Sequence, residues 1–431
     1  MVKKILFFLL FSSIINLCLA QKFDKQINKL ALQYEEEVIN LRHWFHEHAE
    51  LSNREFKTAE RIAAELKRIG YEPQTGIAKT GVVAILKGGK PGPVVALRAD
   101  IDGLPVKERG KLKWASNQMG DYNGEQVPVM HACGHDTHIS ILLGVAKMLY
   151  KIRDQVPGTV KFIFQPAEEG APIGEEGGAK LMVKEGVLEN PHVDVIFGLH
   201  ISADTPVGEI EVKPKGIMAA VNSFRIDIKG VQSHGAYPWE SVDPIVTAAQ
   251  MINSIQTIVS RNSKLIDAAA VVTVGAIHAG VRDNIIPEDL YMLGTIRALD
   301  AEMKTIAHRR LREIVDNIAK ANNAKATLKI NEGYPITYNE PGLYNQMLPT
   351  LRRVAGVSKV KIINAVTGAE DFSFFQEKVP GLYFFIGGSP AGNDPKKAAS
   401  HHTPDFYVDD SGMLLGMKAM TALTLDYMKK K

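Results

Sequence analysis

Short, continuous runs of apolar and β-branched residues mark the first half of the chain. PVVALRAD (93–100), TVKFIFQPAEE (159–169) and VDVIFGLH (193–200) are continuous rather than alternating, which predicts strands buried on both faces. Residues 58–70 have apolar positions at helical spacing and close on a glycine, and residues 139–149 show the same spacing. Strands that alternate with helices predict an α/β fold with a mixed, largely parallel sheet flanked by helices.

Charged or imidazole side chains follow each of these predicted strands. Asp100 ends the first run, Glu168 and Glu169 follow the second, and His200 ends the third. In an open α/β sheet, ligands bind beyond the carboxyl ends of the strands. The sequence therefore predicts a polar site at this edge of the sheet.

From about residue 213 the order of elements changes. The pattern predicts strand 222–230, helix 243–259, strands 268–277 and 290–299, helix 301–320 and strand 325–333. This β-α-β-β-α-β order is that of a ferredoxin-like domain. We therefore expect a signal peptide at residues 1–20, a catalytic domain in two parts at 21–212 and 334–431, and an inserted ferredoxin-like α+β domain at 213–333.

The first twenty residues have the pattern of a secretory signal peptide. Lys3 and Lys4 form a charged start, residues 5–17 are apolar, and Ala20 places a small residue before Gln21. The apolar run is shorter than the roughly 18 residues that a membrane span needs. We expect an exported protein, periplasmic or extracellular, that is not membrane-bound after leader removal; a retained anchor is the alternative.

Charge and cysteine content narrow the function classes. The formal net charge is +3 and the three C-terminal lysines are the one basic block, so nucleic acid is not an expected partner. Of the two cysteines, Cys18 lies in the leader, so Cys133 has no partner for an internal disulfide. That thiol needs another explanation, of which a buried, inert cysteine is the simplest.

The stretch MHACGHDTH (130–138) sets Cys133 among three histidines. A nucleophilic thiol with a histidine base is one interpretation. A metal site accounts better for the surplus of imidazoles, because Cys133 and His135 can bind one ion from a tight turn that Gly134 permits. The paired carboxylates of FQPAEEG and the histidines of FGLH and HHTPDF add further ligands. Together the four motifs favour a metal centre.

Six motifs, taken in order, resemble those of the metal-dependent amidohydrolases that include hippurate hydrolase, aminoacylase-like enzymes and auxin–amino acid conjugate hydrolases. They are RADIDGLP, MHACGHDTH, FQPAEEG, FGLH, SHGAYPWESVDP and HHTPDF, and they span nearly all of the chain after the leader. The resemblance implies a zinc-peptidase-like catalytic domain with two divalent metal ions per subunit, whether Zn, Mn, Co or Ni. The metal ligands that it implies are Cys133, His135, Glu169, His200 and His402.

The resemblance also implies a reaction, the hydrolysis of the amide bond of an N-acyl amino acid or a small peptide. Glu168 is the implied general base, which takes a proton from the attacking water and passes it to the departing amine. His234 is implied to reach the site of a partner subunit in a homodimer formed through the inserted domain. Asn284 and Arg297 are implied to hold the substrate carboxylate. For His234 a capped turn residue, and for Arg297 a solvated cation, are the alternatives.

Two features depart from the wider peptidase pattern. Where that pattern has HxDxxP, this chain has Asp100 in place of the usual ligand histidine, followed by Asp102. We expect these aspartates to support the ligands from behind. His401 stands beside His402, and the spacing to Pro404 favours the second of them as the ligand.

The remaining candidates are interpreted as structural. We expect His131, Asp136 and His138 to be orienting or structural groups, and the histidines of RHWFHEHAE (42–50) to pack or to lie on a helix surface. A non-catalytic protein that binds acyl-amino acids or metal is the alternative to an enzyme, but it would have no need of Glu168. A closed structural zinc site would leave the paired glutamates unexplained.

Overall fold

The computed structural model describes residues 2–266 and 268–429, with side chains from residue 23 onward. The chain forms two compact units: one comprises residues 1–214, 339–363 and 375–431, and the other comprises residues 215–338 and 364–374. The second unit differs from the predicted insert, 213–333, because it extends to residue 338 and includes residues 364–374. Val366 pairs with Met218, and Ala219 donates its N–H to the Gly368 carbonyl at 2.8 Å. These non-local contacts leave no local sequence signal.

An eight-stranded mixed sheet forms the centre of the first unit, in the order β1-β2-β6-β3-β7-β18-β8-β17. Its strands are β1 (Gln74–Ile77), β2 (Gly81–Lys87), β3 (Lys90–Asp100), β6 (Pro157–Gln165), β7 (Val195–Pro206), β8 (Ile210–Val212), β17 (Val360–Ile362) and β18 (Gly381–Ser389). The central strands β6, β3, β7 and β18 run parallel, whereas β1 and β2 pair antiparallel with their neighbours. β8 is antiparallel to β18 and parallel to β17. The predicted largely parallel sheet is confirmed.

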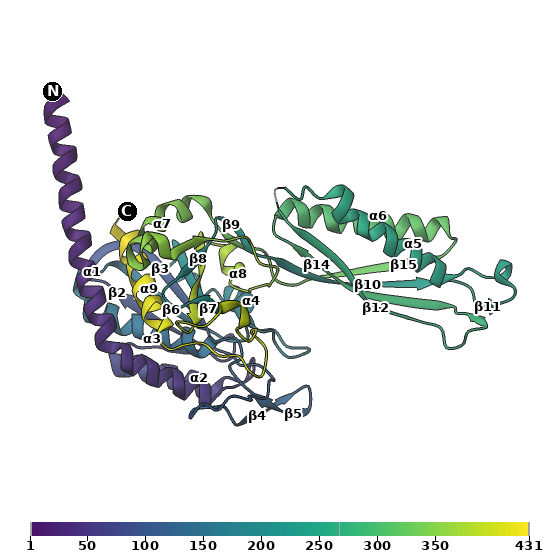
Figure 1. The fold of residues 1–431 in the computed structure, drawn as a ribbon, viewed down its shortest axis with the longest axis horizontal. Helices are drawn as coiled ribbons and strands as arrows, with labels where there is room; N and C mark the ends of the chain where they lie inside the picture. The colour runs from purple at the N-terminus through teal and green to yellow at the C-terminus, as the bar shows by residue number, and fades with distance from the viewer. Residues whose placement is uncertain (1, 267, 430–431) are drawn as a thin grey trace. The chain divides into compact units, whose positions relative to one another are not determined.

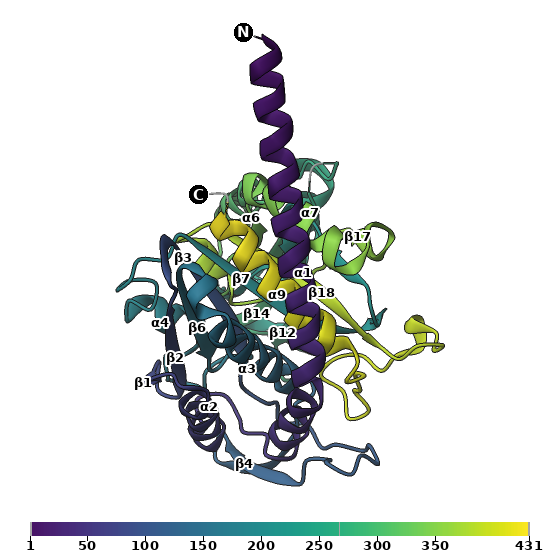
Figure 2. The same cartoon turned by 90° about the vertical axis from the view of Figure 1, so that its left-hand side faces the viewer.

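Helices flank this sheet. They are α1 (Val2–Glu47), α2 (Phe56–Ile69), α3 (His135–Lys151), α4 (Gly178–Lys184), α7 (Pro341–Ala355), α8 (Ser373–Gln376) and α9 (Gly412–Lys429). α3 packs against α1, α2 and α9, and α9 contacts the central strands β3, β6, β7 and β18 (Figure 2). Leu423 and Phe197 are fully buried within this layer. Burial of side chains of this kind contributes about 1.5–3 kcal/mol each and holds the helices on the sheet.

The predicted helix 58–70 corresponds to α2, which ends as expected. Gly70 has φ of 118° and donates its N–H to the carbonyls of Leu66 and Lys67. A Cβ at this position would lie 2.3 Å from the Tyr150 hydroxyl oxygen. Glycine is therefore required both by the left-handed backbone and by the close approach of Tyr150.

The second unit is a four-stranded antiparallel sheet with two helices on one face (Figure 1). Its elements are β10 (Ala220–Lys229), α5 (Pro244–Thr257), β12 (Ala270–Ala279), β14 (Asp289–Ala298), α6 (Ala301–Ala321) and β15 (Lys325–Glu332). Alternate residues of β10, Phe224, Ile226 and Ile228, are buried beneath the helices. Asp243 and Asp300 cap the two helices by accepting backbone N–H bonds. The order of elements is the β-α-β-β-α-β order that the sequence predicts.

Short strands and turns make up the rest of the regular secondary structure. They are β4 (Gln118–Tyr122), β5 (Glu125–Val129), β9 (Lys215–Met218), β11 (Ser233–His234), β13 (Ile285–Ile286), β16 (Thr337–Asn339), the 3₁₀ turns Arg153–Gln155, Pro238–Glu240, Val357–Lys359 and Pro395–Lys397, and a π turn at Ile258–Asn262. Across the described residues, no helix is both long enough and apolar enough to cross a membrane. The side chains of the predicted signal peptide lie outside the described residues, and that assignment stays a prediction.

Candidate metal centre

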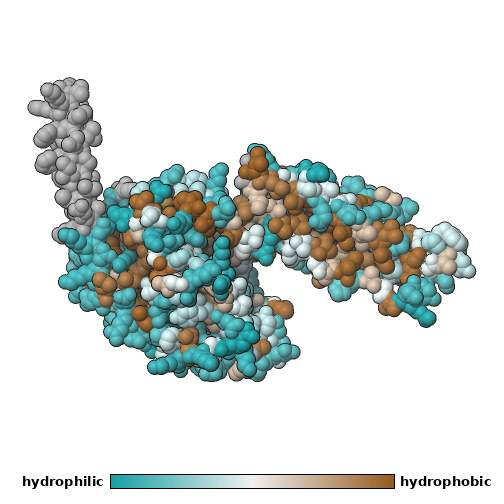
Figure 3. Space-filling model, in the orientation of Figure 1, coloured by the Kyte–Doolittle hydropathy of each residue, from teal (hydrophilic) through white to brown (hydrophobic). Residues whose placement is uncertain are grey.

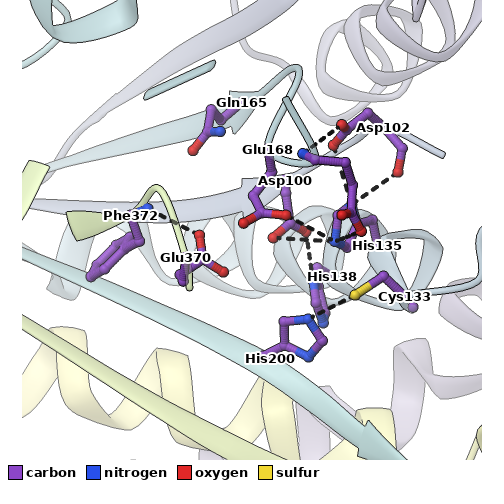
Figure 4. A network of polar contacts seen from close by, with 12 residues as sticks. Asp100, Asp102, Cys133, His135, His138, Gln165, Glu168, His200, Glu370 and Phe372 are labelled. Atoms are coloured by element: carbon purple, nitrogen blue, oxygen red, sulfur yellow. Dashed lines mark hydrogen bonds and ion pairs between the residues drawn. The ribbon is translucent and has the colours of Figure 1, made fainter. Parts of the chain in front are cut away.

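The acidic and imidazole residues predicted at the strand ends lie together in the first unit (Figure 4). Asp102 follows β3, Glu168 and Glu169 lie in the turn after β6, and His200 lies within β7. Cys133 precedes the first turn of α3, and His135 begins that helix. This placement follows from the parallel strands, whose carboxyl ends meet at one edge of the sheet.

Cys133 lies at the middle of the cluster. Its Sγ is 3.3 Å from His200 Nε2 and 3.3 Å from His402 Nε2. Ligand atoms of Cys133, Glu169 and His402 all lie within 4.8 Å of one another, as do those of His135, Glu168 and Glu169. The structure thus brings together all five predicted ligands and the predicted base.

A left-handed glycine shapes the turn that carries the first two ligands. Gly134 has φ of 96° and precedes the first residue of α3. A Cβ at this position would lie 2.6 Å from Ile201 Cγ2. Cys133 and His135 can therefore flank one tight turn only because residue 134 has no side chain.

Hydrogen bonds fix which nitrogen of His135 faces the cluster. Nδ1 lies 2.9 Å from the Asp102 carbonyl and 3.2 Å from Asp102 Oδ1, so Nδ1 donates and Nε2 is the nitrogen left to face the cluster. Nε2 is buried without a hydrogen-bond partner among the described residues, 3.8 Å from Glu168 Oε2 and 3.9 Å from Glu169 Oε1. An unpaired imidazole nitrogen facing carboxylates is the arrangement of a metal ligand supported from behind.

His200 and His402 also direct Nε2 toward the thiol. His200 Nδ1 lies 2.5 Å from the Ile201 carbonyl, to which it donates. His402 has φ of 64°, which is uncommon for a residue with a Cβ, and its N–H donates to the Ala132 carbonyl at 2.8 Å. His402 Nε2 lies 3.1 Å from Glu169 Oε1. Both imidazoles can therefore offer a lone pair to a shared cation.

The imidazoles of His138 and His401 have both ring nitrogens engaged in other hydrogen bonds. His138 Nδ1 lies 2.6 Å from Asp100 Oδ1, and its Nε2 accepts from the Ile201 N–H at 2.8 Å. His401 Nε2 accepts from the Ala203 N–H at 3.1 Å, which leaves Nδ1 to donate to the Cys133 carbonyl at 3.2 Å. Neither ring retains a free lone pair, which favours His402 over His401 as a ligand.

The two aspartates hold the ligands in place. Asp100 pairs with Arg98 at 2.7 Å and with His138, and Asp102 Oδ2 accepts from the Glu169 N–H at 3.0 Å. Burial raises the pKa of Asp100, but the charges of His135, His138 and Arg98 outweigh burial and lower it well below its ordinary value. These contacts are compatible with the supporting role expected of both aspartates, which stays a prediction.

The electrostatics of the cluster fit a cation. Burial, followed by the nearby Glu169 and Glu168 carboxylates, raises the pKa of the Cys133 thiol well above its ordinary value. Burial lowers the pKa of His200 well below its ordinary value. A thiol and two carboxylates in so small a buried space repel one another as anions, and a divalent ion would relieve this repulsion. With the unpaired His135 Nε2, the donor set suits Zn or a neighbouring first-row metal.

Comparison with known proteins identifies the family. Residues 96–426 match peptidase family M20/M25/M40. The chain belongs to this family. It is 38% identical over 415 residues to thermostable carboxypeptidase 2 of Saccharolobus solfataricus, covering 96% of this chain and 100% of the relative. It is 35% identical over 382 residues to N-acetyl-L-cysteine deacetylase of Bacillus subtilis, covering 88% and 85%.

Other M20 relatives agree with this assignment. IAA-amino acid hydrolase ILR1-like 2 of Arabidopsis thaliana is 34% identical over 398 residues, covering 91% of this chain and 86% of the relative. A Bacillus subtilis crystal structure described as a dinuclear metal-binding peptidase of the M20 family matches with a TM-score of 0.77 and 32% identity, covering 93% of this chain and 99% of that one. The predicted resemblance to metal-dependent amidohydrolases is confirmed.

Three predicted residues lie in the second unit. His234 lies in β11, which pairs with β13, and its Nδ1 accepts from the Ala236 N–H at 3.0 Å. The Asn284 carbonyl accepts from the Gly235 N–H at 2.8 Å, so His234 and Asn284 lie on adjacent segments. Burial lowers the pKa of Arg297, which lies on β14. Their roles stay predictions.

Sequence reasoning missed a buried ionic network behind the centre. Arg42 Nε lies 3.1 Å from Asp136 Oδ2, and His46 lies 3.0 Å from the same oxygen and 3.3 Å from Glu108. His46 is buried, consistent with the packing expected of this motif, but its ion pairs were not predicted. The i, i+4 spacing of Arg42 and His46, on the helix face that also buries Phe45, is the one available signal.

Proposed function

We propose that this M20-family protein hydrolyses the amide bond of N-acyl amino acids or related small peptide conjugates. The observation that carries the proposal is the convergence of Cys133, Glu169 and His402 with His135 and Glu168 in one cluster, in which Cys133, His135 and Glu168 are buried and His402 is exposed. Relatives named for N-acetyl-L-cysteine and for IAA–amino acids support the substrate class. A relative named carboxypeptidase supports small peptides as a second group of substrates.

Two divalent ions are proposed as the cofactor. The relative described as a dinuclear metal-binding peptidase supports this number, and the ligands would be Cys133, His135, Glu169, His200 and His402. Zn, Mn, Co and Ni all suit this mixture of thiolate, imidazole and carboxylate. When bound, such ions supply Lewis acidity, which favours attack by water near neutral pH and polarises an acyl carbonyl.

Glu168 is the proposed general base and then general acid. Its side chain is buried, and its Oε2 lies 3.8 Å from His135 Nε2, the same nitrogen that Glu169 Oε1 approaches at 3.9 Å. Glu168 takes a proton from the attacking water and delivers it to the departing amine. Proton transfer by a positioned group of this kind contributes about 10²- to 10⁴-fold to the rate.

A thiol mechanism has less support. Attack by Cys133 requires the thiolate, yet burial and the neighbouring carboxylates raise the pKa of this thiol well above its ordinary value. The adjacent His200 has a pKa lowered by burial, so it is a poor partner for a thiolate–imidazolium pair. A non-catalytic binding role has less support too, because the chain retains Glu168.

A homodimer formed through the second unit is proposed as well. Val271, Ile277 and Leu293, on β12 and β14, are large apolar side chains between 38% and 49% exposed, which a partner copy would cover. Figure 3 shows apolar residues gathered on the visible face of this unit. In such a dimer His234 would reach the partner subunit's site, and Asn284 and Arg297 would hold the substrate carboxylate. Export by a cleaved leader at residues 1–20 is likewise a proposal.

The test is metal-reconstituted hydrolysis of a panel of N-acyl amino acids and dipeptides, with wild type compared to Glu168→Gln. Glu168→Gln should retain its bound metal and lose nearly all turnover, because an amide cannot accept the proton. Glu176→Gln is the matched control, since Glu176 is an exposed glutamate in the same loop, paired with Lys184. Full turnover in Glu168→Gln would disprove the assignment of the base.

A further inference from the structure

The turn that carries Glu168 has a strained backbone. Residues 166–170 follow β6, and Ala167 has φ of 53°, in the left-handed region. A residue with a Cβ pays about 1–2 kcal/mol to adopt this conformation. Other contacts must therefore hold the turn, and they decide where the Glu168 carboxylate lies.

Glu55 supplies one of these contacts across the fold. Its carboxyl group is fully buried, and Oε1 accepts from the Ala167 N–H at 2.9 Å. Oε2 accepts from Thr80 Oγ1 at 2.6 Å. The residue just before Glu168 in the chain is thus tied to a carboxylate that is 112 positions away from it.

Glu55 lies where its carboxyl group could cap its own helix, so it is significant that this group bonds elsewhere. Glu55 occupies the N-cap of α2, where a side-chain oxygen ordinarily accepts a helix N–H, yet it makes no such bond. Burying a carboxyl group is costly unless it gains hydrogen bonds. The bonds that Glu55 gains go to the turn and to Thr80 rather than to its own helix.

The same loop secures the other side of Glu168. Ser52 Oγ donates to Asp102 Oδ2 at 2.6 Å, and this oxygen accepts from the Glu169 N–H at 3.0 Å. The backbone N–H groups of residues 167 and 169 are therefore both held by buried carboxylates. Glu168 lies between two fixed points of the backbone.

We propose that Glu55 is a positioning residue for the reaction: through the Ala167 N–H, it holds the strained turn so that the Glu168 carboxylate meets the attacking water. The inference rests on the proposed function, because it takes Glu168 as the base. A misplacement of about 1 Å in a catalytic group can cost about 10²-fold in rate. Glu55 touches neither substrate nor metal in this role.

Two substitutions separate positioning from helix capping. Glu55→Asp keeps a favourable N-cap residue and the carboxyl group, but this group is one methylene short of the Ala167 N–H. Glu55→Gln keeps an acceptor oxygen for Ala167, and its amide can donate to Thr80 Oγ1. Glu60→Asp is the matched control, an exposed glutamate on the same helix.

The measurements are metal content, the thermal unfolding midpoint, and kcat and KM on the best N-acyl amino acid of the panel. We expect Glu55→Asp to keep its metal and lower kcat by about 10- to 100-fold with KM changed less than about threefold. Glu55→Gln should stay within about threefold of wild-type kcat. Glu60→Asp should be unchanged.

Three results would overturn the inference. One is wild-type kcat in Glu55→Asp, another is an equal defect in Glu55→Asp and Glu55→Gln, and the third is loss of metal from Glu55→Asp, which would place the effect on the ligands. Glu168→Gln is assayed alongside. If Glu168→Gln keeps its turnover, the proposed function itself fails. If Glu168→Gln is inactive and Glu55→Asp is fully active, only the positioning role fails.

Discussion

The pH dependence of stability should reveal the charge of His46. This imidazole is buried, with Nδ1 at 3.0 Å from Asp136 Oδ2 and Nε2 at 3.3 Å from Glu108 Oε2. Because both ring nitrogens face carboxylates, the imidazolium can donate to both. Burial alone lowers the pKa of His46, but the hydrogen bonds to Asp136 and Glu108 outweigh burial and raise the pKa from 6.5 to about 9.

The size of the effect follows from linkage. A pKa that is higher in the folded than in the unfolded state gives stability that is complete below about pH 6.5 and is lost as the pH rises through about 9. At about 1.4 kcal/mol for each pH unit between the two values, His46 contributes about 3 kcal/mol at pH 6. More than half of this contribution is gone by about pH 8.

The assay is urea unfolding of metal-free wild type and His46→Gln between pH 6 and pH 10. Glu55 and Lys161 also titrate in this range, but they do so in both proteins, so the difference in unfolding free energy isolates His46. We expect this difference to shrink by about 3 kcal/mol as the pH rises. His192→Gln, which removes an exposed histidine paired with Glu189, is the matched control. A difference for His46→Gln that stays constant or grows with pH would refute the reasoning.

Three further outcomes follow from the buried contacts. Arg42→Met leaves the buried Asp136 carboxylate without its guanidinium partner and should cost about 3–5 kcal/mol in urea unfolding; a loss below about 1 kcal/mol would contradict this. Gly134→Ala forces a Cβ to 2.6 Å from Ile201 Cγ2 at a left-handed position, so metal content measured by mass spectrometry should fall, and full metal content would count against the turn geometry. Chelation should abolish hydrolysis, whereas alkylation of the metal-loaded protein should do little because Cys133 is buried; the reverse result would favour a thiol mechanism.

The residues that converge in the candidate metal centre could be predicted from the sequence because each of them lies in a recognisable local motif. Cys133 and His135 flank a glycine at a helix start, and Glu169 follows a strand and a proline. The sequence also favoured His402 by its spacing to Pro404, and the hydrogen bonds give an independent reason for the same choice. Such patterns can be recognised in a sequence because the carboxyl ends of parallel strands meet at one edge of the sheet in any fold of this class.

The supporting residues carry no such mark. Arg42 and Asp136 are 94 positions apart, and Glu55 and Ala167 are 112 positions apart, so only the folded chain brings them together. The return of residues 364–374 to the second unit was missed for the same reason. Buried polar residues on an amphipathic helix read as surface positions unless their partners are known.

The contacts behind the centre indicate that it keeps its shape before a metal binds. Asp100 is paired with Arg98, and Asp136 is paired with Arg42, so the carboxylates behind the ligands already have their counter-charges. By contrast, the contacts of Glu169 Oε1 are to the predicted ligands themselves, with His402 Nε2 at 3.1 Å and His135 Nε2 at 3.9 Å. The supporting carboxylates are therefore paired with arginines, whereas the Glu169 carboxylate faces the other ligands. Because the supporting carboxylates are already paired, they need not rearrange when a cation binds. The helical circular dichroism of the chelated protein should therefore match that of the metal-loaded protein.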